Sequence, residues 1–322
     1  TKALTYRQLD SAANKLAAVL IDRGVQAGTL VHVRGTVQLA SSGSLAGTDA
    51  SFTYRLTDGD VAVKTETGEE LCARYLIDAS GQAWRDPKIP RVVAGVNAHA
   101  LANFNERGIV SSPDRIVTVL LPVLDALHRL AGLARITATV IVPASDAGRA
   151  GQEDLARETM ALLNARHYER RFFPQQIAFN VLGQLGGAGE DGQTERERRI
   201  VGELRELLPA PQLAAAVQLV HGACFFGYGI AVELALEQQA EPATLVEALR
   251  VAPGTELIES LDASDCPSPV VDATRSALIR VARLRAGAGP RTLAFWLTAD
   301  NIRCAAALNA VASAETLVRD HL

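Results

Sequence analysis

After Pro113 the sequence alternates between segments of helical and strand-like periodicity, and this alternation restricts the fold more than any other feature. The apolar segment 116–131 is expected to form a helix, and 135–142, which is rich in β-branched residues, a strand. Further strands are expected at 217–236 and 292–297. Strands that alternate with helices are typical of the α/β and α+β classes, and we expect an α/β chain.

Thr194 and Glu197 predict the start of a helix, because Thr-x-x-Glu is the pattern of a capping box. Three arginines lie in this predicted helix, Arg196, Arg198 and Arg199. Acidic neighbours dilute their charge, and a phosphate-binding surface requires a concentrated basic patch. We therefore interpret these arginines as a solvated helix face.

The composition excludes several classes of function. The chain of 322 residues has a formal net charge of −4, so no global basic field would hold nucleic acid or an anionic membrane. No apolar run reaches the roughly 18 residues that span a bilayer. Four cysteines (Cys72, Cys224, Cys266 and Cys304) form no CxxC pair, which argues against a zinc site and a disulfide framework. We expect a cytoplasmic protein without a metal site.

Three segments carry specific motifs. Residues 177–181 read IAFNV and are followed by EDGQT at 190–194, while 298–310 contain ADN followed by ALNA. A third pattern is IDASG at 77–81. Over about residues 75–322 these motifs resemble signatures of the aspartate-semialdehyde dehydrogenase family.

Two shorter motifs, Phe225-Phe226-Gly227 and Ser111-Ser112-Pro113, are similar in detail to the Usg branch of that family. The family resemblance implies an NADPH-dependent reductive dephosphorylation of β-aspartyl phosphate. In that reaction a cysteine thiolate attacks the acyl carbon, a histidine moves protons and an arginine holds the substrate carboxylate.

The resemblance also implies a two-domain fold. Residues 1–113 would form a degenerate, Rossmann-like dinucleotide domain, completed by the C-terminal helix 301–322. Residues 114–300 would form an α+β mixed-sheet domain of the dehydrogenase catalytic and dimerisation type. Since that domain pairs two subunits in the family, we expect a homodimer.

The family's catalytic residues are replaced when the resemblance is followed along this sequence. The nucleophile position falls on Asp114 and Arg115, and the expected glutamine falls on Val142. The substrate arginine and the catalytic histidine fall on Leu219 and Phe226. None of these side chains can perform the chemistry of the residue that it replaces.

Three nearby residues offer alternatives. His221 and Cys224 would serve either as a displaced acid/base and thiol, or as a partly buried histidine and a small core cysteine, which we favour. Asp114 is either a carboxylate nucleophile or the N-cap of the following helix, and we favour the cap.

The family's cofactor is NADP, but this sequence lacks the glycine-rich turn that would hold its phosphates. Residues 4–28 instead resemble the opening of adenylate-forming domains, without their phosphate loop. Either the N-terminus has diverged or been replaced, or the first strand and turn precede this sequence. By resemblance, Ser80, Gly81, Asp300 and Asn301 would still contact the cofactor, although each suits a turn or a helix cap equally well.

We therefore expect a catalytically inactive member of this family that acts as a dimeric binding or interaction protein and holds no cofactor firmly. The alternative is an NADP-dependent oxidoreductase of amino-acid biosynthesis that acts on an aldehyde or acyl phosphate through other residues.

Overall fold

The computed structural model describes residues 53–57, 60–64, 70–73, 89–106 and 110–320. Ser80 and Gly81, which the resemblance assigns to the cofactor, lie outside these residues. The chain divides into two compact units, 1–83 and 84–322.

In the first unit, three strands form an antiparallel sheet in chain order. They are β1 (Thr53–Thr57), β2 (Asp60–Lys64) and β3 (Glu70–Ala73).

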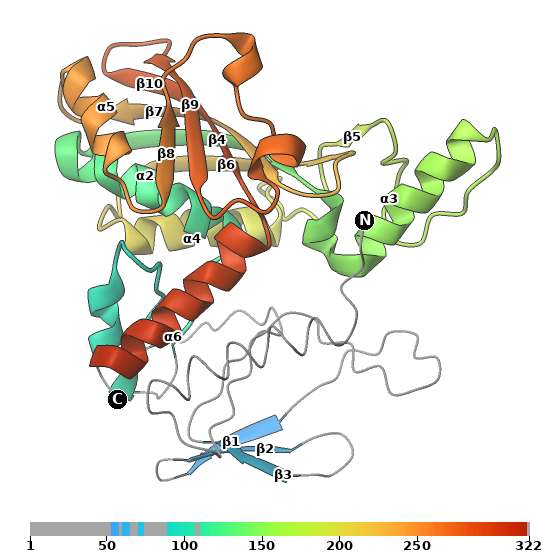
Figure 1. Ribbon diagram of the computed structural model, residues 1–322, viewed down its shortest axis with the longest axis horizontal. Helices are drawn as coiled ribbons and strands as arrows, with labels where there is room; N and C mark the ends of the chain where they lie inside the picture. Colours follow the sequence, from blue (N-terminus) through green and yellow to red (C-terminus); the bar gives the residue numbers. More distant parts are fainter. Residues whose placement is uncertain (1–52, 58–59, 65–69, 74–88, 107–109, 321–322) are drawn as a thin grey trace. The chain divides into compact units, whose positions relative to one another are not determined.

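The second unit is built on a mixed sheet of seven strands (Figure 1). In spatial order these are β5 (Val181–Leu182), β6 (Ala214–Gly222), β4 (Leu133–Val142), β7 (Tyr228–Leu236), β10 (Thr292–Ala299), β9 (Ile279–Ala286) and β8 (Thr255–Ile258). Strands β4 and β6 run parallel, as do β8 and β9, and the other neighbours are antiparallel. The expected mixed sheet of an α/β chain is confirmed.

Helix α2 (Arg115–Ala131) and helix α4 (Glu195–Leu207) pack on one face of this sheet. The remaining elements are η1 (Ala98–Glu106), η2 (Ala144–Ala147), α3 (Gly148–Leu163), α5 (Pro242–Arg250), η3 (Ala263–Asp265), η4 (Pro269–Ala273), η5 (Arg303–Ala307) and α6 (Leu308–Asp320). The single C-terminal helix predicted at 301–322 is thus a π-helical turn, η5, followed by α6. None of the helices among the described residues is long and apolar enough to cross a bilayer.

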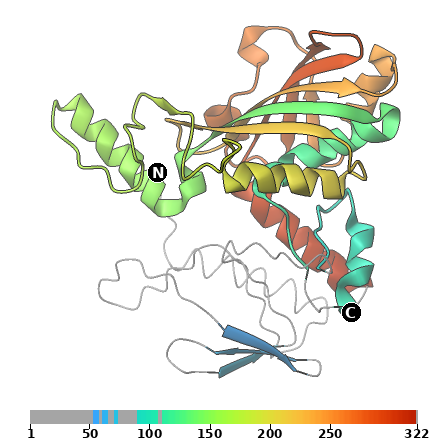
Figure 2. The ribbon, with the colours of Figure 1, turned by 180° about the vertical axis from the view of Figure 1, so that it is seen from behind.

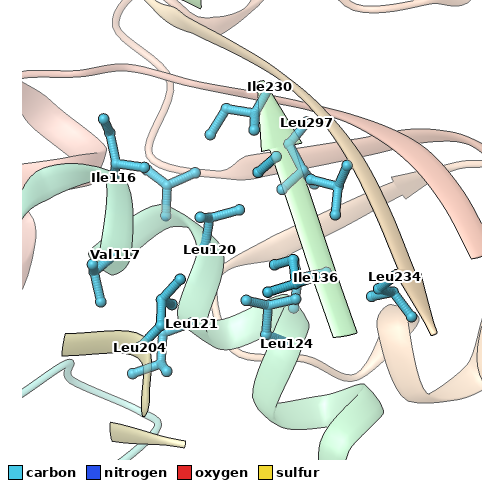
Figure 3. Packing of buried hydrophobic residues seen from close by; sticks show 14 of the residues in the cluster. Ile116, Val117, Leu120, Leu121, Leu124, Ile136, Leu204, Ile230, Leu234 and Leu297 are labelled. Carbon is cyan, nitrogen blue, oxygen red and sulfur yellow. The ribbon is translucent and has the colours of Figure 1, made fainter. Parts of the chain in front are cut away.

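The core surrounds α2, whose apolar side chains meet the sheet and α4 (Figure 3). Leu120 and Leu124 lie near Ile136 of β4, and Leu121 lies near Leu204 of α4. All of these side chains are fully buried. Residues 116–124 of α2 are buried on every side, while Arg129 in its last turn is exposed, so the apolar helix predicted at 116–131 is confirmed.

The sheet has one covered and one open face in the single chain. Along β4, Ile136, Ala138 and Val140 are buried on the helix side, while Thr137 and Thr139 between them are more exposed. Alternate residues of a strand point to opposite faces, so this pattern separates the core face from an outer face.

Helix α3 extends beyond the β5 edge of the sheet (Figures 1 and 2) and holds the following loop through two buried carboxylates. Asp154 accepts hydrogen bonds from the backbone N–H groups of residues 171–173 and from the Tyr168 hydroxyl. Glu158 accepts from the N–H groups of Ile177 and Ala178, both at 2.8–2.9 Å. Buried backbone donors without a strand partner are satisfied in this way.

Asn309 of α6 links the last helix to residues 92–112. Its side chain accepts from the Ala94 N–H and donates to the Val92 carbonyl and the Ser112 hydroxyl. Both segments belong to the compact unit 84–322, and the domain boundary at 113 stays a prediction.

Candidate functional site

The carboxylate of Asp114 closes the N-terminus of α2. Its Oδ1 accepts the Ile116 N–H at 2.9 Å, so the capping interpretation is confirmed. Arg196 donates from Nε to Oδ2 at 2.9 Å and from Nη2 to Oδ1 at 3.2 Å, and Arg199 donates to Oδ2 at 2.9 Å. Such a paired arrangement is the strongest geometry for a guanidinium and a carboxylate.

These neighbours determine the charge of Asp114. Burial alone would raise the pKa of its carboxyl, but the charge of Arg196 and the hydrogen bonds from Arg196, Ile116 and Arg199 outweigh burial and lower the pKa to about 2. The carboxylate is therefore ionised, and both of its oxygens are engaged.

A second carboxylate, Asp146 in η2, lies on the other side of Arg196. It accepts hydrogen bonds from Arg196, from the Tyr228 hydroxyl and from Arg115, the last at 3.3 Å. Burial, followed by the charge of Asp146, raises the pKa of Tyr228 well above its ordinary value, so the phenol keeps its proton. We call Asp114, Asp146, Arg115, Arg196, Arg199 and Tyr228 the ion cluster.

The ion cluster corrects the interpretation as a solvated face for Arg196 and Arg199, whereas Arg198 is exposed as expected. The side chain of Arg196 is only 26% exposed, and Arg199 also pairs with Asp114. The two aspartates supply the charge that the local sequence lacks. A buried guanidinium needs such partners, because an unpaired buried charge is strongly destabilising.

Glu203, also on α4, holds the backbone where α2 begins. Its Oε2 accepts the Asp114 N–H at 2.7 Å, and its Oε1 lies 3.8 Å from Nε of Arg91. Burial raises the pKa of Glu203 to about 7, reinforced by the charge of Asp114 and opposed by that hydrogen bond and by Arg91.

The predicted capping box is present at the start of α4 and reaches the sheet. Thr194 accepts the Glu197 N–H, and Glu197 accepts the N–H of Thr194. The other oxygen of Glu197 accepts the Leu219 N–H of β6 at 2.8 Å. One buried carboxylate thus fixes α4 against β6.

A pocket of about 220 Å³ opens beside the ion cluster. Its polar wall consists of Asp146, Thr194, Arg196 and His221, and its apolar wall of Ala147, Phe172, Leu185 and Leu219. Leu219 and His221 face it together because they are two residues apart on β6. Burial lowers the pKa of His221, so the imidazole is neutral near pH 7.

Asn301 connects two loops beneath this region. Its side chain accepts the Gly227 N–H at 3.0 Å and exchanges hydrogen bonds with the Ser145 hydroxyl. Gly227 has φ +84°, and a Cβ there would lie 2.1 Å from the Pro269 carbonyl oxygen, so only glycine fits.

Asn301 is therefore not the cap of the last helix. The capping role belongs to Asp300, whose Oδ1 accepts the N–H groups of Ile302 and Arg303 and whose Oδ2 accepts that of Arg275.

A model of the semialdehyde dehydrogenase dimerisation domain matches residues 121–304, more than half of the chain. The chain belongs to the aspartate-semialdehyde dehydrogenase family. The USG-1 protein homolog of Azotobacter vinelandii is 39% identical over 245 residues, which is 76% of this chain and 72% of that protein. The prediction of the family and of its Usg branch is confirmed.

Aspartate-semialdehyde dehydrogenases themselves are somewhat more distant. Aspartate-semialdehyde dehydrogenase 2 of Vibrio cholerae is 32% identical over 265 residues, or 79% of this chain and 78% of that protein. The crystal structure of aspartate semialdehyde dehydrogenase II from Vibrio cholerae, complexed with ASA, superimposes with a TM-score of 0.71 at 33% identity, covering 74% of this chain and 70% of that one.

In this member of the aspartate-semialdehyde dehydrogenase family, the positions assigned to catalysis by resemblance do not lie together in one site. Asp114 and Arg115 lie in the ion cluster, and Leu219 lines the pocket. Val142 is fully buried in the core, and Phe226 makes no contact with the cluster that the structure records. His221 and Tyr228, each two residues further along, lie in the pocket wall and the ion cluster instead.

Cys224 is half-buried, and burial raises the pKa of its thiol. A thiol with a raised pKa is protonated near neutrality and a poor nucleophile. The interpretation of Cys224 as an inert cysteine therefore agrees with its surroundings.

The two described residues assigned to the cofactor are occupied by internal bonds. Asn301 is fully buried, and the Asp300 carboxylate holds three backbone N–H groups. Among the described residues, no group of three or more His, Cys, Asp and Glu side chains could hold a metal ion.

Proposed function

We propose that this chain is a non-catalytic member of the aspartate-semialdehyde dehydrogenase family, which acts as a dimeric binding or interaction protein. The observation that carries the proposal is the start of α2, where the resemblance places the nucleophile. Asp114 and Arg115 stand there, and both oxygens of Asp114 are bound by arginines or backbone.

The remaining side chains of the region support the same conclusion. A carboxylate with a pKa of about 2 is a weak nucleophile, and the protonated thiol of Cys224 is another. The Tyr228 hydroxyl donates a hydrogen bond to Asp146, and its raised pKa keeps the phenol protonated. Neutral His221 remains as a hydrogen-bonding group suited to a bound ligand.

An assay of the family reaction tests this proposal. With L-aspartate semialdehyde, NADP and phosphate, the purified protein should reduce no NADP above a blank. The aspartate-semialdehyde dehydrogenase 2 of Vibrio cholerae serves as the positive control. A rate within about 10³-fold of an ordinary enzyme, for which kcat is ~10 per second, would instead establish the oxidoreductase.

The dimer is proposed from the match to a dimerisation domain. The matched residues, 121–304, contain all seven strands of the sheet. The outer face of that sheet carries mostly small or uncharged side chains, among them Thr137, Thr139, Ala216 and Ala231. Such a face is suited to burial against a second copy of itself.

A further inference from the structure

A second, larger hollow of about 490 Å³ lies where strands β4 and β6 end, and we call it the outer groove. It is lined by Ile141 of β4, by Gly222 of β6, and by residues of the segments 179–181, 222–224 and 268–270. None of the described residues that line it carries a charge. The outer groove therefore offers a partner mainly apolar contact.

The few polar side chains of the outer groove are bonded within the chain. Asn180 donates to the Gln176 carbonyl, and the Ser268 hydroxyl donates to the Asp272 carboxylate. Asp272 is not among the lining residues, and Arg280 supplies its counter-charge. No side chain of the groove is thus placed to select a charged ligand.

The outer groove continues the outer face of the sheet. Alternate residues of β4 point to this face, so Ile141 follows Thr137 and Thr139 on it. Gly222 adjoins Ile141 on β6, because a Cβ at Gly222 would lie 2.9 Å from the Ile141 side chain. The lining residues also fall within 121–304, the part that matches a dimerisation domain.

Large apolar side chains beside the outer groove are left uncovered in the single chain. Phe179 is 67% exposed, Val181 60% and Val270 49%. Single exposed apolar residues are ordinary, but several that line one hollow mark a surface for another protein. Aromatic side chains in particular are enriched at protein interfaces.

The backbone holds Phe179 in this exposed position at a cost. Its φ is +58°, a left-handed conformation that a bulky residue seldom adopts. The flanking turn imposes it: Glu158 binds the N–H groups of Ile177 and Ala178, and the Asn180 N–H donates to the Ile177 carbonyl at 3.0 Å. Burial of the ring does not repay this strain in one chain, so a contact outside the chain is its natural compensation.

The opposite side of the outer groove is rigid. The Trp296 indole N–H donates to the Pro267 carbonyl at 2.8 Å. At Gly229, a Cβ would lie 2.6 Å from the Trp296 ring and 2.9 Å from Pro269. Such close packing fixes the segment 268–270 on the sheet, so the hollow is formed before any partner binds.

A second copy of the chain fits this surface. A two-fold interface uses the same patch of both subunits, so a projecting group and the hollow that receives it must lie on one patch. The exposed Phe179 ring and the outer groove satisfy this requirement, because they lie side by side on the face assigned to the dimer.

We propose that in the homodimer the Phe179 ring of each copy packs into the outer groove of the other copy, against Val181 and Val270. The inference rests on the proposed function, because it identifies the contact through which the proposed dimer forms.

Photo-crosslinking of the full chain tests this contact. With p-benzoylphenylalanine in place of Phe179, ultraviolet light should yield a denatured species near twice 34.2 kDa. Its mass spectrum should join position 179 to residues 222–224 or 268–270. The same probe in place of Val251 is the control, since Val251 is 70% exposed but follows α5, which packs on α2 and so belongs to the other side of the sheet. That probe should give no cross-linked dimer.

Phe179→Asn tests the energy of the same contact. Asparagine adopts the left-handed conformation more readily than phenylalanine, so the turn should keep its fold, which circular dichroism checks. The dissociation constant of the dimer in sedimentation equilibrium should rise at least tenfold, whereas Val251→Asn should leave it unchanged.

The outcomes separate this inference from the homodimer itself. If the unaltered chain is a dimer, the inference is overturned when position 179 gives no cross-link between chains, when its cross-links lie outside the outer groove, or when Phe179→Asn dimerises as tightly. A monomeric unaltered chain would contradict both proposals.

Discussion

Glu203 joins three parts of the chain through one carboxyl group. It lies on α4, accepts the N–H of the residue that caps α2, and faces Arg91 from the segment before α2. Arg91 is held a second time by Glu206, at 2.7 Å. Glu203 is buried, whereas the side chain of Glu206 is half exposed.

Glu203 should make the stability of the protein depend on pH. Its folded pKa of about 7 lies above the ordinary value of 4.5, so its contribution is fully present below pH 4.5 and is lost as the pH rises through about 7. The free energy of unfolding of the unaltered chain, minus that of Glu203→Gln, should fall by on the order of 2–3 kcal/mol between pH 4.5 and 8.

Urea unfolding at a series of pH values measures this difference. Glu206→Gln, which removes the other carboxylate beside Arg91, is the matched control. A flat curve for Glu203→Gln would show that Glu203 titrates like an exposed acid.

Asn301 should matter to stability rather than to cofactor binding. Asn301→Ala leaves the Gly227 N–H and the Ser145 hydroxyl without their partner, and it should cost about 2–3 kcal/mol of unfolding free energy. Asn180→Ala, at an exposed position, should change stability by less than about 0.5 kcal/mol.

Fluorescence titration with NADP completes that comparison. We expect millimolar or weaker binding before and after the Asn301→Ala substitution, because the sequence has no glycine-rich phosphate turn. Micromolar NADP binding that Asn301→Ala abolishes would instead reveal a working cofactor site.

The candidate site was predictable from the sequence only where the signal is local. An aspartate directly before an apolar helix indicates an N-cap, and Thr-x-x-Glu indicates a capping box; both are present. Arg196 was misinterpreted because its partners, Asp114 and Asp146, lie 82 and 50 residues away. The assignment of the substrate arginine to Leu219 and of the catalytic histidine to Phe226 rests on resemblance alone. In the structure, His221 lies in the pocket wall and Tyr228 in the ion cluster.

At the scale of elements, α3 illustrates how acids inside a helix can organise a loop. Asp154 gathers three successive backbone N–H groups and a tyrosine hydroxyl, so the loop needs no strand of its own. The hydrogen bonds from Phe173, Tyr168, Arg171 and Phe172 overcome the effect of burial, which opposes them, and lower the pKa of Asp154.

Removing that carboxylate should release the loop while α3 itself remains folded. In Asp154→Ala the N–H groups of residues 171–173 lose their acceptor, and we expect at least tenfold faster amide exchange there and faster proteolysis between Arg166 and Arg171. The neighbouring Glu153→Ala is the matched control, because Glu153 lies at the surface, forms ion pairs with Arg149 and Arg157 of its own helix and accepts no backbone N–H of the loop that the structure records. Equal exchange rates in the two variants would contradict the assigned role of Asp154.

At the scale of the whole molecule, periodicity predicted the elements that have a clean pattern and missed those that do not. Helix α2 and strands β4 and β10 were predicted close to their observed bounds. Sequence analysis assigns no element to 242–286, where α5, β8 and β9 form. Strand β9 alternates apolar and charged residues, but the alternation changes phase at Ala282 and Arg283, where its register with β10 also shifts. No local sequence signal predicts the order of the strands in the sheet.

A homodimer should form through the outer face of the sheet. Sedimentation at micromolar concentration should give a mass near twice 34.2 kDa. Ala231→Glu places a charge in the middle of that face, where Ala231 pairs with Thr139 and Trp296, and should yield a monomer. Val251→Glu, at a position 70% exposed beyond α5, should remain dimeric. A monomeric unaltered chain would contradict the proposed homodimer.

The strand order has a consequence for synthesis on the ribosome. Helix α2 and strand β4 are made early, but their partners β6, β7 and β10 follow later, the last of them ending at Ala299. At 5–20 residues per second, the apolar side chains of α2 wait on the order of 10–30 seconds for the sheet that covers them. During that interval the nascent chain exposes a helix whose residues 116–124 are almost all apolar, which is the kind of surface that chaperones recognise and that aggregates when they are absent.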